Sequence, residues 1–129
     1  MKKVVIRPAR SPAAVGPYNH AVRVGDLLFC AGQIPVDPAT GALVEGDIRA
    51  QTEQVLKNIG AILEDQGLGF EHVVKSTVFL TDLNDFAAMN EVYARFFTHD
   101  HPARSTVQVA ALPRGARVEI EVIAHYPGA

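Results

Sequence analysis

The chain has 129 residues, 48% of them hydrophobic, which is enough apolar material for a single domain over residues 1–129 with a real core. Its 12 basic and 14 acidic residues give a formal net charge of -2, which excludes an overall basic field that would attract a phosphate backbone. We therefore expect no nucleic acid as a main partner.

The start of the chain and its cysteine content bear on the compartment. Val4, Val5 and Ile6 form an apolar run that is too short for a signal peptide or a membrane span. Cys30 is the single cysteine, so no internal disulfide can form, and its apolar surroundings indicate an inert buried thiol. These features predict a cytoplasmic protein with no membrane partner.

The first predicted elements are two strands, over 19–24 and 27–31. Gly25 and Asp26 separate them and have the residue types of a tight hairpin turn. A turn at Gly32-Gln33 then opens a loop rich in glycine and proline. We expect a hairpin followed by this loop.

A helix is predicted between Asp47, a candidate N-cap, and Gly67, a suitable C-terminal stop. The apolar residues between them recur at helical spacing: Ile48, Val55, Ile59, Ile62 and Leu63. A strand over 72–81 follows, because that run is rich in Val, Thr and Phe.

The second half of the chain continues with another helix and two strands. Oxygens of residues 82–85 can cap the helix, which carries an apolar stripe of Phe86, Met89, Tyr93, Phe96 and Phe97. Strands over 104–110 and 117–126 close the chain. The predicted order is β-β-α-β-α-β-β, with room for an extra N-terminal strand.

Two helices can cover only one face of a sheet of five or six strands. The other face, which carries Ile123, would stay partly apolar and wet. Burial against further copies of the chain is the remedy, although this reasoning does not fix the number of subunits.

Arg104 is the strongest candidate for chemistry. It follows Pro102-Ala103 and opens a strand, and its planar fork can bind both oxygens of a carboxylate while staying charged. The alternative is a structural ion pair with Asp100 or Glu119.

Glu119 and Glu121 point to the same side of the last strand, together with His125, whereas the opposite side is uniformly apolar. A partly buried carboxylate there could serve as a general base that activates water. Two solvated carboxylates on an outer strand are the alternative.

The spacing between these candidates is long. If the last two strands pair as a hairpin around residues 113–115, Glu119 lies near Gln108, and Arg104 is roughly 13 Å further along. Either a bulge shifts the register, or a neighbouring subunit supplies part of the site.

Three further positions could line a ligand cleft. Tyr18, in a turn, could wall a pocket or simply pack. Asn90 interrupts an apolar stripe, so it either fastens a loop or reaches a ligand. Gly32 could present backbone groups to a substrate or merely turn the chain.

We expect no metal and no cofactor. His99 and His101 are the only close pair among five histidines, and neither has a carboxylate or cysteine set at zinc spacing. No phosphate loop or dinucleotide fingerprint occurs.

Five segments together resemble the YjgF/RidA family over nearly the whole chain. They are Gly16-Pro17-Tyr18, Ala31-Gly32-Gln33-Ile34-Pro35, the run 75–83 (KSTVFLTDL) and the run 102–107 (PARSTV), followed by 118–121 (VEIE).

The resemblance implies a chorismate-mutase-like α+β fold: a mixed sheet with two helices on one face, and a homotrimer whose sheets form a central barrel. It also implies intersubunit clefts that hydrolyse 2-aminoacrylate, 2-iminopropanoate or 2-iminobutanoate to 2-keto acids without a cofactor. By position, Arg104 would bind the carboxylate and Glu119 would orient or activate water. The cleft would be lined by Tyr18, Gly32 and Asn90.

Two positions depart from the family pattern, because Thr106 stands where members often carry cysteine and Ala31 where many carry serine. Both remain candidate substrate-binding positions, and the absence of a hydroxyl at Ala31 could change how water or the imine nitrogen is held. Competing functions are a keto-acid-binding regulatory module that uses the Arg104 cleft, an aminoacrylate deaminase of pyrimidine catabolism, and a ribonuclease or translation inhibitor. The last is the weakest, given the acidic balance.

Overall fold

Strands and helices follow one another in the predicted order, with the extra N-terminal strand present. The structure is a computed structural model that describes residues 1–10, 13–14 and 16–128. Its α-helices are α1 (Ile48–Asp65) and α2 (Phe86–Phe96). The strands are β1 (Lys3–Ile6), β2 (Ala21–Val24), β3 (Leu27–Gln33), β4 (Val73–Leu80), β5 (Ala103–Gln108) and β6 (Val118–His125). Short 3-10 turns span Phe70–His72, Leu83–Asp85 and Pro113–Gly115.

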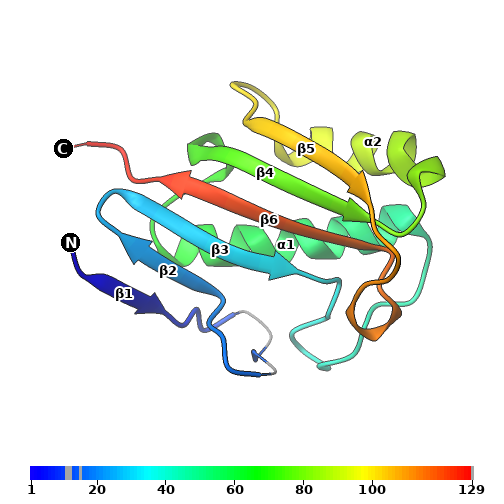
Figure 1. Cartoon of the computed structure of the whole chain (residues 1–129), viewed down its shortest axis with the longest axis horizontal. Coiled ribbons are helices and arrows are strands. Elements are labelled where there is room, and N and C mark those ends of the chain that lie inside the picture. The colour runs from blue at the N-terminus through cyan, green and yellow to red at the C-terminus, as the bar shows by residue number, and fades with distance from the viewer. Residues whose placement is uncertain (11–12, 15, 129) are drawn as a thin grey trace.

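All of these strands join one mixed sheet in the order β1-β2-β3-β6-β4-β5 (Figure 1). Only β4 and β5 run parallel, and the other neighbouring pairs are antiparallel. The hairpin considered for the last two strands does not form, because β4 lies between β5 and β6. A helical crossover such as α2 joins parallel neighbours, so it places β5 at the sheet edge beyond β4.

The hairpin of β2 and β3 is confirmed, with Val24 opposite Leu27 around Gly25 and Asp26. Gly25 has φ of 58°, a left-handed conformation that favours glycine in a tight turn. β2 begins at Ala21 rather than at residue 19.

The predicted boundaries of α1 are confirmed. The Asp47 side chain accepts a hydrogen bond of 3.0 Å from the Ala50 amide at the N-terminus. Gly67 has φ of 70° beyond the last turn, and the Leu68 amide donates to the Leu63 carbonyl, which ends the helix. The five predicted apolar residues of this helix are all buried.

Both helices pack on one face of the sheet, behind it in Figure 1. The core-facing residues of β6 alternate with its outward residues, and all four are buried: Val118, Ile120, Val122 and Ala124. The stripe of α2 is only partly core, since Met89, Tyr93 and Phe97 are buried but Phe86 is 39% exposed. Phe86 leaves the core because it begins the helix at the sheet edge.

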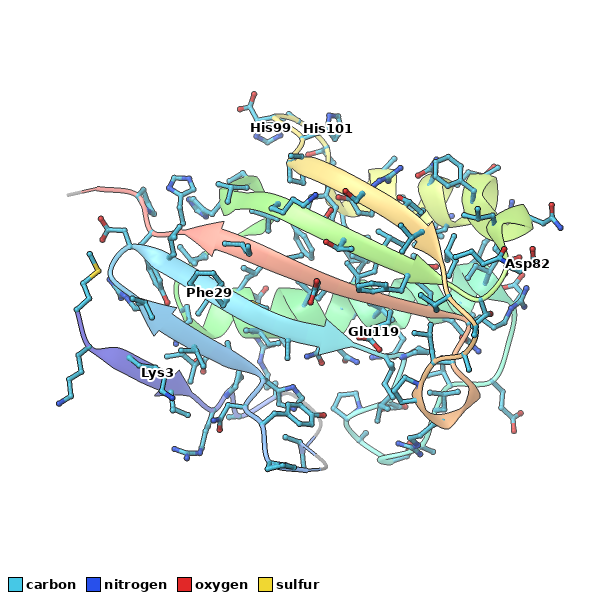
Figure 2. The ribbon with its side chains drawn as sticks, in the orientation of Figure 1. Lys3, Phe29, Asp82, His99, His101 and Glu119 are labelled. Atoms are coloured by element: carbon cyan, nitrogen blue, oxygen red, sulfur yellow. The ribbon has the colours of Figure 1, made fainter. Side chains whose placement is uncertain are left out.

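The opposite face of the sheet keeps exposed apolar side chains. Leu27, Phe29 and Val107 are each about 40% exposed, at 40%, 42% and 42%, and Ile123 is half-buried. Phe29 lies on this face, the one turned to the reader in Figure 2. Such a patch fits the expectation of a partner surface. Within the described residues, no helix combines the length and apolar character that a membrane crossing requires.

Candidate functional site

Arg104 lies near the start of β5, directly opposite Ser76 on β4. Ser76 is fully buried beneath α2, so the register directs Arg104 to the helix-covered face of the sheet. The Arg104 Cζ atom lies 4.7 Å from the centre of the Tyr93 ring and 5.5 Å from that of Phe86. The guanidinium is therefore held by aromatic rings on α2.

No carboxylate among the described residues lies within ion-pair distance of Arg104, so the structural ion pair with Asp100 or Glu119 is wrong. Instead, the guanidinium borders a cavity of 380 Å³. Asn90 and His101 also line this cavity. Asn90 thus borders a cavity, and its predicted contact with a ligand stays a prediction.

Thr106 lies two residues beyond Arg104, opposite the buried Val78 of β4. It is half-buried on the same sheet face, so its hydroxyl shares the side of the sheet that carries the guanidinium. Thr106 thus places a polar hydroxyl where members of the family that the sequence resembles often carry cysteine.

Glu119 lies on the open face of the sheet, near the start of β6 (Figure 2). It is half-buried, and the predicted placement of Glu119 and Glu121 on one side is confirmed by the burial pattern of the strand. Burial raises the pKa of Glu119 above its ordinary value, and the negative charge of Glu121 raises it further. A carboxyl group with a raised pKa is suited to exchange protons nearer to neutral pH.

The side chain of Glu119 occupies the space that a side chain at Gly32 would fill. The predicted turn at Gly32-Gln33 is wrong, because both residues belong to β3, where the pairing with β6 shifts between Cys30 and Gln33. A Cβ atom on Gly32 would come within 2.8 Å of the Glu119 carboxylate carbon. Glycine here leaves room for the Glu119 carboxylate, which would have to shift if a Cβ atom were present, and it does not form a turn.

A second cavity, of 320 Å³, is lined by Gly32, Tyr18 and Arg114. Tyr18 is 46% exposed and meets the His20 ring edge-on, so it walls this cavity rather than packing in the core. Ala31 precedes Gly32 on β3, and its amide donates to the His20 carbonyl at 2.8 Å.

The predicted site residues thus fall into two groups that do not meet within one chain. Glu119 is opposite Phe79, which is opposite Val107, so Arg104 lies three residues further along and two strands away. These steps amount to roughly 14 Å, and the two side chains leave opposite faces of the sheet. Arg104, Asn90 and Thr106 form one group, while Tyr18, Ala31, Gly32 and Glu119 form the other.

The sequence did not predict three residues that lie close to the candidate site residues. Tyr93 and Phe86 were assigned to the apolar stripe, yet both rings contact Arg104. Gln33 is 3% exposed and its amide nitrogen lies 3.0 Å from His20 Nδ1. A usable signal existed for Tyr93, because a buried tyrosine hydroxyl needs a polar partner.

Among the described residues, the cysteine provides no reactive thiol and the histidines provide no metal-binding group. Cys30 is buried, as predicted, and burial raises the pKa of its thiol to about 12, which leaves it protonated and unreactive. Across residues 1–10, 13–14 and 16–128, no three or more His, Cys, Asp or Glu side chains are grouped to hold a metal ion.

Comparison with known proteins gives consistent results. Residues 8–126 match the family described as Endoribonuclease L-PSP. Protein DfrA of Myxococcus xanthus is 55% identical over 96% of both chains. A Capra hircus protein named 2-iminobutanoate/2-iminopropanoate deaminase is 51% identical over 93% of this chain and 88% of its own. The crystal structure of E. coli TdcF with bound serine superposes with a TM-score of 0.91, at 45% identity, over 96% of this chain and 99% of that one.

Proposed function

The chain belongs to the Endoribonuclease L-PSP family, the YjgF/RidA proteins, and from that premise we propose that it hydrolyses 2-imino acids to 2-keto acids and ammonia in the cytoplasm. Its substrates would be the short imino and enamine acids 2-aminoacrylate, 2-iminopropanoate and 2-iminobutanoate. The deaminase name of the Capra hircus relative supports this reaction type.

One observation carries the proposal: Arg104 borders a cavity without a carboxylate partner among the described residues. A guanidinium with free N–H donors binds a carboxylate through two parallel hydrogen bonds. A small imino acid offers few handles besides its carboxylate. Arg104 can therefore fix such a substrate and aim its C2 atom.

The chemistry is addition of water to a carbon–nitrogen double bond. Water adds to C2 while the π electrons move to nitrogen, which takes up a proton. The hydroxyl of the resulting carbinolamine then loses its proton, which passes to the nitrogen, and the oxygen electrons form the C=O bond as the C–N bond breaks, leaving the 2-keto acid and ammonia. 2-Aminoacrylate enters this scheme after transfer of a proton from its nitrogen to C3 converts it to 2-iminopropanoate. Glu119 accepts the proton of the attacking water and returns it to nitrogen, a role that its raised pKa favours. No cofactor enters this scheme.

The two groups of site residues require an assembly to act together. We infer a homotrimer in which the open faces of the sheets turn inward and Arg104 of one protomer approaches the Glu119 group of its neighbour. Support comes from the exposed apolar side chains on that face, including Phe29 and Val107. Light scattering at micromolar concentration tests the assembly, and a monomeric mass would contradict it.

A coupled assay tests the reaction. A threonine or serine dehydratase generates the imino acid, semicarbazide traps it, and the lifetime of the imine is followed with and without this protein. We expect catalytic amounts of protein to shorten that lifetime. An unchanged lifetime at stoichiometric protein would contradict the deaminase function.

A binding module that senses a keto or amino acid is the second candidate. The serine that TdcF holds, in a structure similar to this one, favours it, because serine offers the same carboxylate handle without an imine. The coupled assay separates the two functions, since a binding module leaves the imine lifetime unchanged at low protein concentration.

A further inference from the structure

Tyr93 connects Arg104 to the interior of the protein. Its ring centre is 4.7 Å from Arg104 Cζ, and its hydroxyl lies 2.7 Å from Ser76 Oγ. Ser76 is fully buried and Tyr93 is only 5% exposed. The three side chains form a continuous series of contacts from the core to the cavity.

Two contacts fix the Tyr93 side chain, one at its hydroxyl and one on the face of its ring. Ser76 on β4 is paired with Arg104 on β5. The hydrogen bond with Ser76 therefore fixes the Tyr93 hydroxyl directly beside the strand position of Arg104. The ring also stacks on Phe97, with centroids 4.2 Å apart and an angle of 17° between the planes. A ring held in this way offers the guanidinium a rigid surface.

Phe86 adds a second ring on the same helix. Residues 86 and 93 are seven apart, which is two turns, so their side chains share one face of α2. Both rings lie beside the guanidinium. Aromatic faces attract a cation without occupying its N–H donors, whereas an ion pair would occupy them. The aromatic side chains therefore hold Arg104 without a carboxylate partner among the described residues, and the N–H donors that do not face Tyr93 stay available to a ligand.

We propose that Tyr93 is a positioning residue for Arg104, anchored by Ser76, and that it sets the affinity of the site for the substrate carboxylate. The identity of the substrate rests on the proposed function. The positioning of Arg104 is a separate claim about this chain.

The protonation state of Tyr93 agrees with this role. Burial raises the pKa of its hydroxyl, while the hydrogen bond with Ser76, the charge of Arg104 and a hydrogen bond with Arg104 act in the opposite direction. The hydroxyl stays neutral at pH 7. An ionised Tyr93 would attract the guanidinium as an anion and would compete with the substrate carboxylate.

Tyr126 provides a matched control elsewhere in the chain. Arg23 Cζ lies 3.6 Å from the centre of its ring, and its hydroxyl donates to Gln66 Oε1 at 2.6 Å. The Arg23 Nε atom donates to the Gly25 carbonyl, so this guanidinium is already engaged by backbone. Both sites place an arginine over the ring of a tyrosine whose hydroxyl is hydrogen-bonded, but only Arg104 lines the 380 Å³ cavity.

The experiment compares Tyr93→Leu, Tyr93→Phe and Ser76→Ala with Tyr126→Leu and Tyr126→Phe. Binding of 2-oxobutanoate is measured by calorimetry, imine hydrolysis gives KM and kcat, and thermal unfolding confirms that each variant is folded. Tyr93→Leu should raise KM and weaken 2-oxobutanoate binding by about 5- to 30-fold, with a smaller change in kcat. Tyr93→Phe and Ser76→Ala should each weaken 2-oxobutanoate binding by about two- to tenfold. The Tyr126 variants should lower the melting temperature and leave KM within about twofold.

A measurement that needs no substrate completes the test. The heteronuclear NOE of the Arg104 Nε–Hε group, assigned by its disappearance in Arg104→Lys, should fall in Tyr93→Leu and stay unchanged in Tyr126→Leu. An unaltered NOE together with unaltered 2-oxobutanoate affinity in folded Tyr93→Leu would overturn the proposal. If the wild type binds 2-oxobutanoate but leaves the imine lifetime unchanged, the deaminase function is wrong, and the 2-oxobutanoate affinities of the variants test the positioning role of Tyr93. If the wild type neither binds 2-oxobutanoate nor shortens the imine lifetime, the NOE alone tests that role.

Discussion

The cavity beside Arg104 and the cavity beside Gly32 have similar volumes, 380 and 320 Å³, but different kinds of backbone structure line them. The first rests on regular structure, since β4, β5 and α2 fix the surroundings of the guanidinium. The second is formed at an irregular point of β3 and by loops, with the half-exposed Tyr18 as a wall. Arg104 is thus surrounded by regular structure, whereas Gly32 lies where the pairing of β3 with β6 is irregular.

Separation of the two groups within one chain has a physical benefit. A carboxylate beside Arg104 would form an ion pair, which lowers the carboxyl pKa and occupies the guanidinium donors. Glu119 instead lies near Glu121 on the opposite face, where its pKa is raised. Within one chain, therefore, the described residues form no ion pair between Arg104 and Glu119.

The largest expected effect is at Arg104. Arg104→Ala should abolish measurable imine hydrolysis, because removing a charge-assisted hydrogen bond from a desolvated site costs about 2–5 kcal/mol, or about 30- to several-thousand-fold. Arg104→Lys should rescue little, since an ammonium lacks the planar two-bond geometry. Hydrolysis and thermal unfolding are measured on the same preparation, with Arg23→Ala as the control that removes another ring-bound arginine. Full activity in folded Arg104→Ala would refute the site.

Replacement of the carboxylate in the second group should have the next largest effect. Glu119→Gln should lower kcat on the order of 100-fold with little change in KM, because proton transfer is abolished while carboxylate binding at Arg104 is kept. Steady-state kinetics of the coupled assay measure this. Glu121→Gln, on the same strand face, is the matched control and should stay within a few-fold of wild type.

Gly32→Ala tests the position of Glu119 rather than its chemistry. The added methyl group would meet the Glu119 carboxylate and displace it, so kcat should fall about tenfold. In the Glu119→Gln background the same change should have a much smaller effect on kcat, because the displaced group no longer transfers protons. Equal reductions in both backgrounds would contradict the link between the two residues.

Mixed assemblies test whether the two groups act across protomers. Co-expressed Arg104→Ala and Glu119→Gln chains should recover about one quarter of wild-type activity, because random pairing leaves about one intact site in four. Each variant purified alone is the control. No recovery in mixed assemblies would place the complete site within a single chain.

The smallest expected effect concerns stability and pH. Because the pKa of Glu119 is raised in the folded protein, its contribution to stability is full below the unfolded pKa and is lost as pH rises through the folded pKa. At pH 7 the ionised group is therefore destabilising, and Glu119→Gln should slightly raise the melting temperature. That gain should vanish near pH 3.5, below the ordinary pKa of about 4.3. A lower melting temperature for the variant at pH 7 would contradict the raised pKa.

The local sequence determined the elements of this protein and its family. Asp47, the helical spacing of apolar residues and Gly67 all act within a few residues of α1, so the sequence placed that helix correctly. The alternation along β6 likewise predicted which side carries Glu119. The motifs around Tyr18, Gly32 and Arg104 identified the family, because short segments at a fixed order need no knowledge of the fold.

Only the tertiary structure decided how these elements meet. Whether β5 lies beside β6 or β4 depends on the crossover through α2, which the residue pattern of β5 did not predict. The same topology sends Arg104 and Glu119 to opposite faces, shifts the pairing at Gly32 and places Ser76 under Tyr93. Contacts between residues distant in sequence arise from packing of the whole sheet against α1 and α2, so they cannot be derived from spacing along the chain.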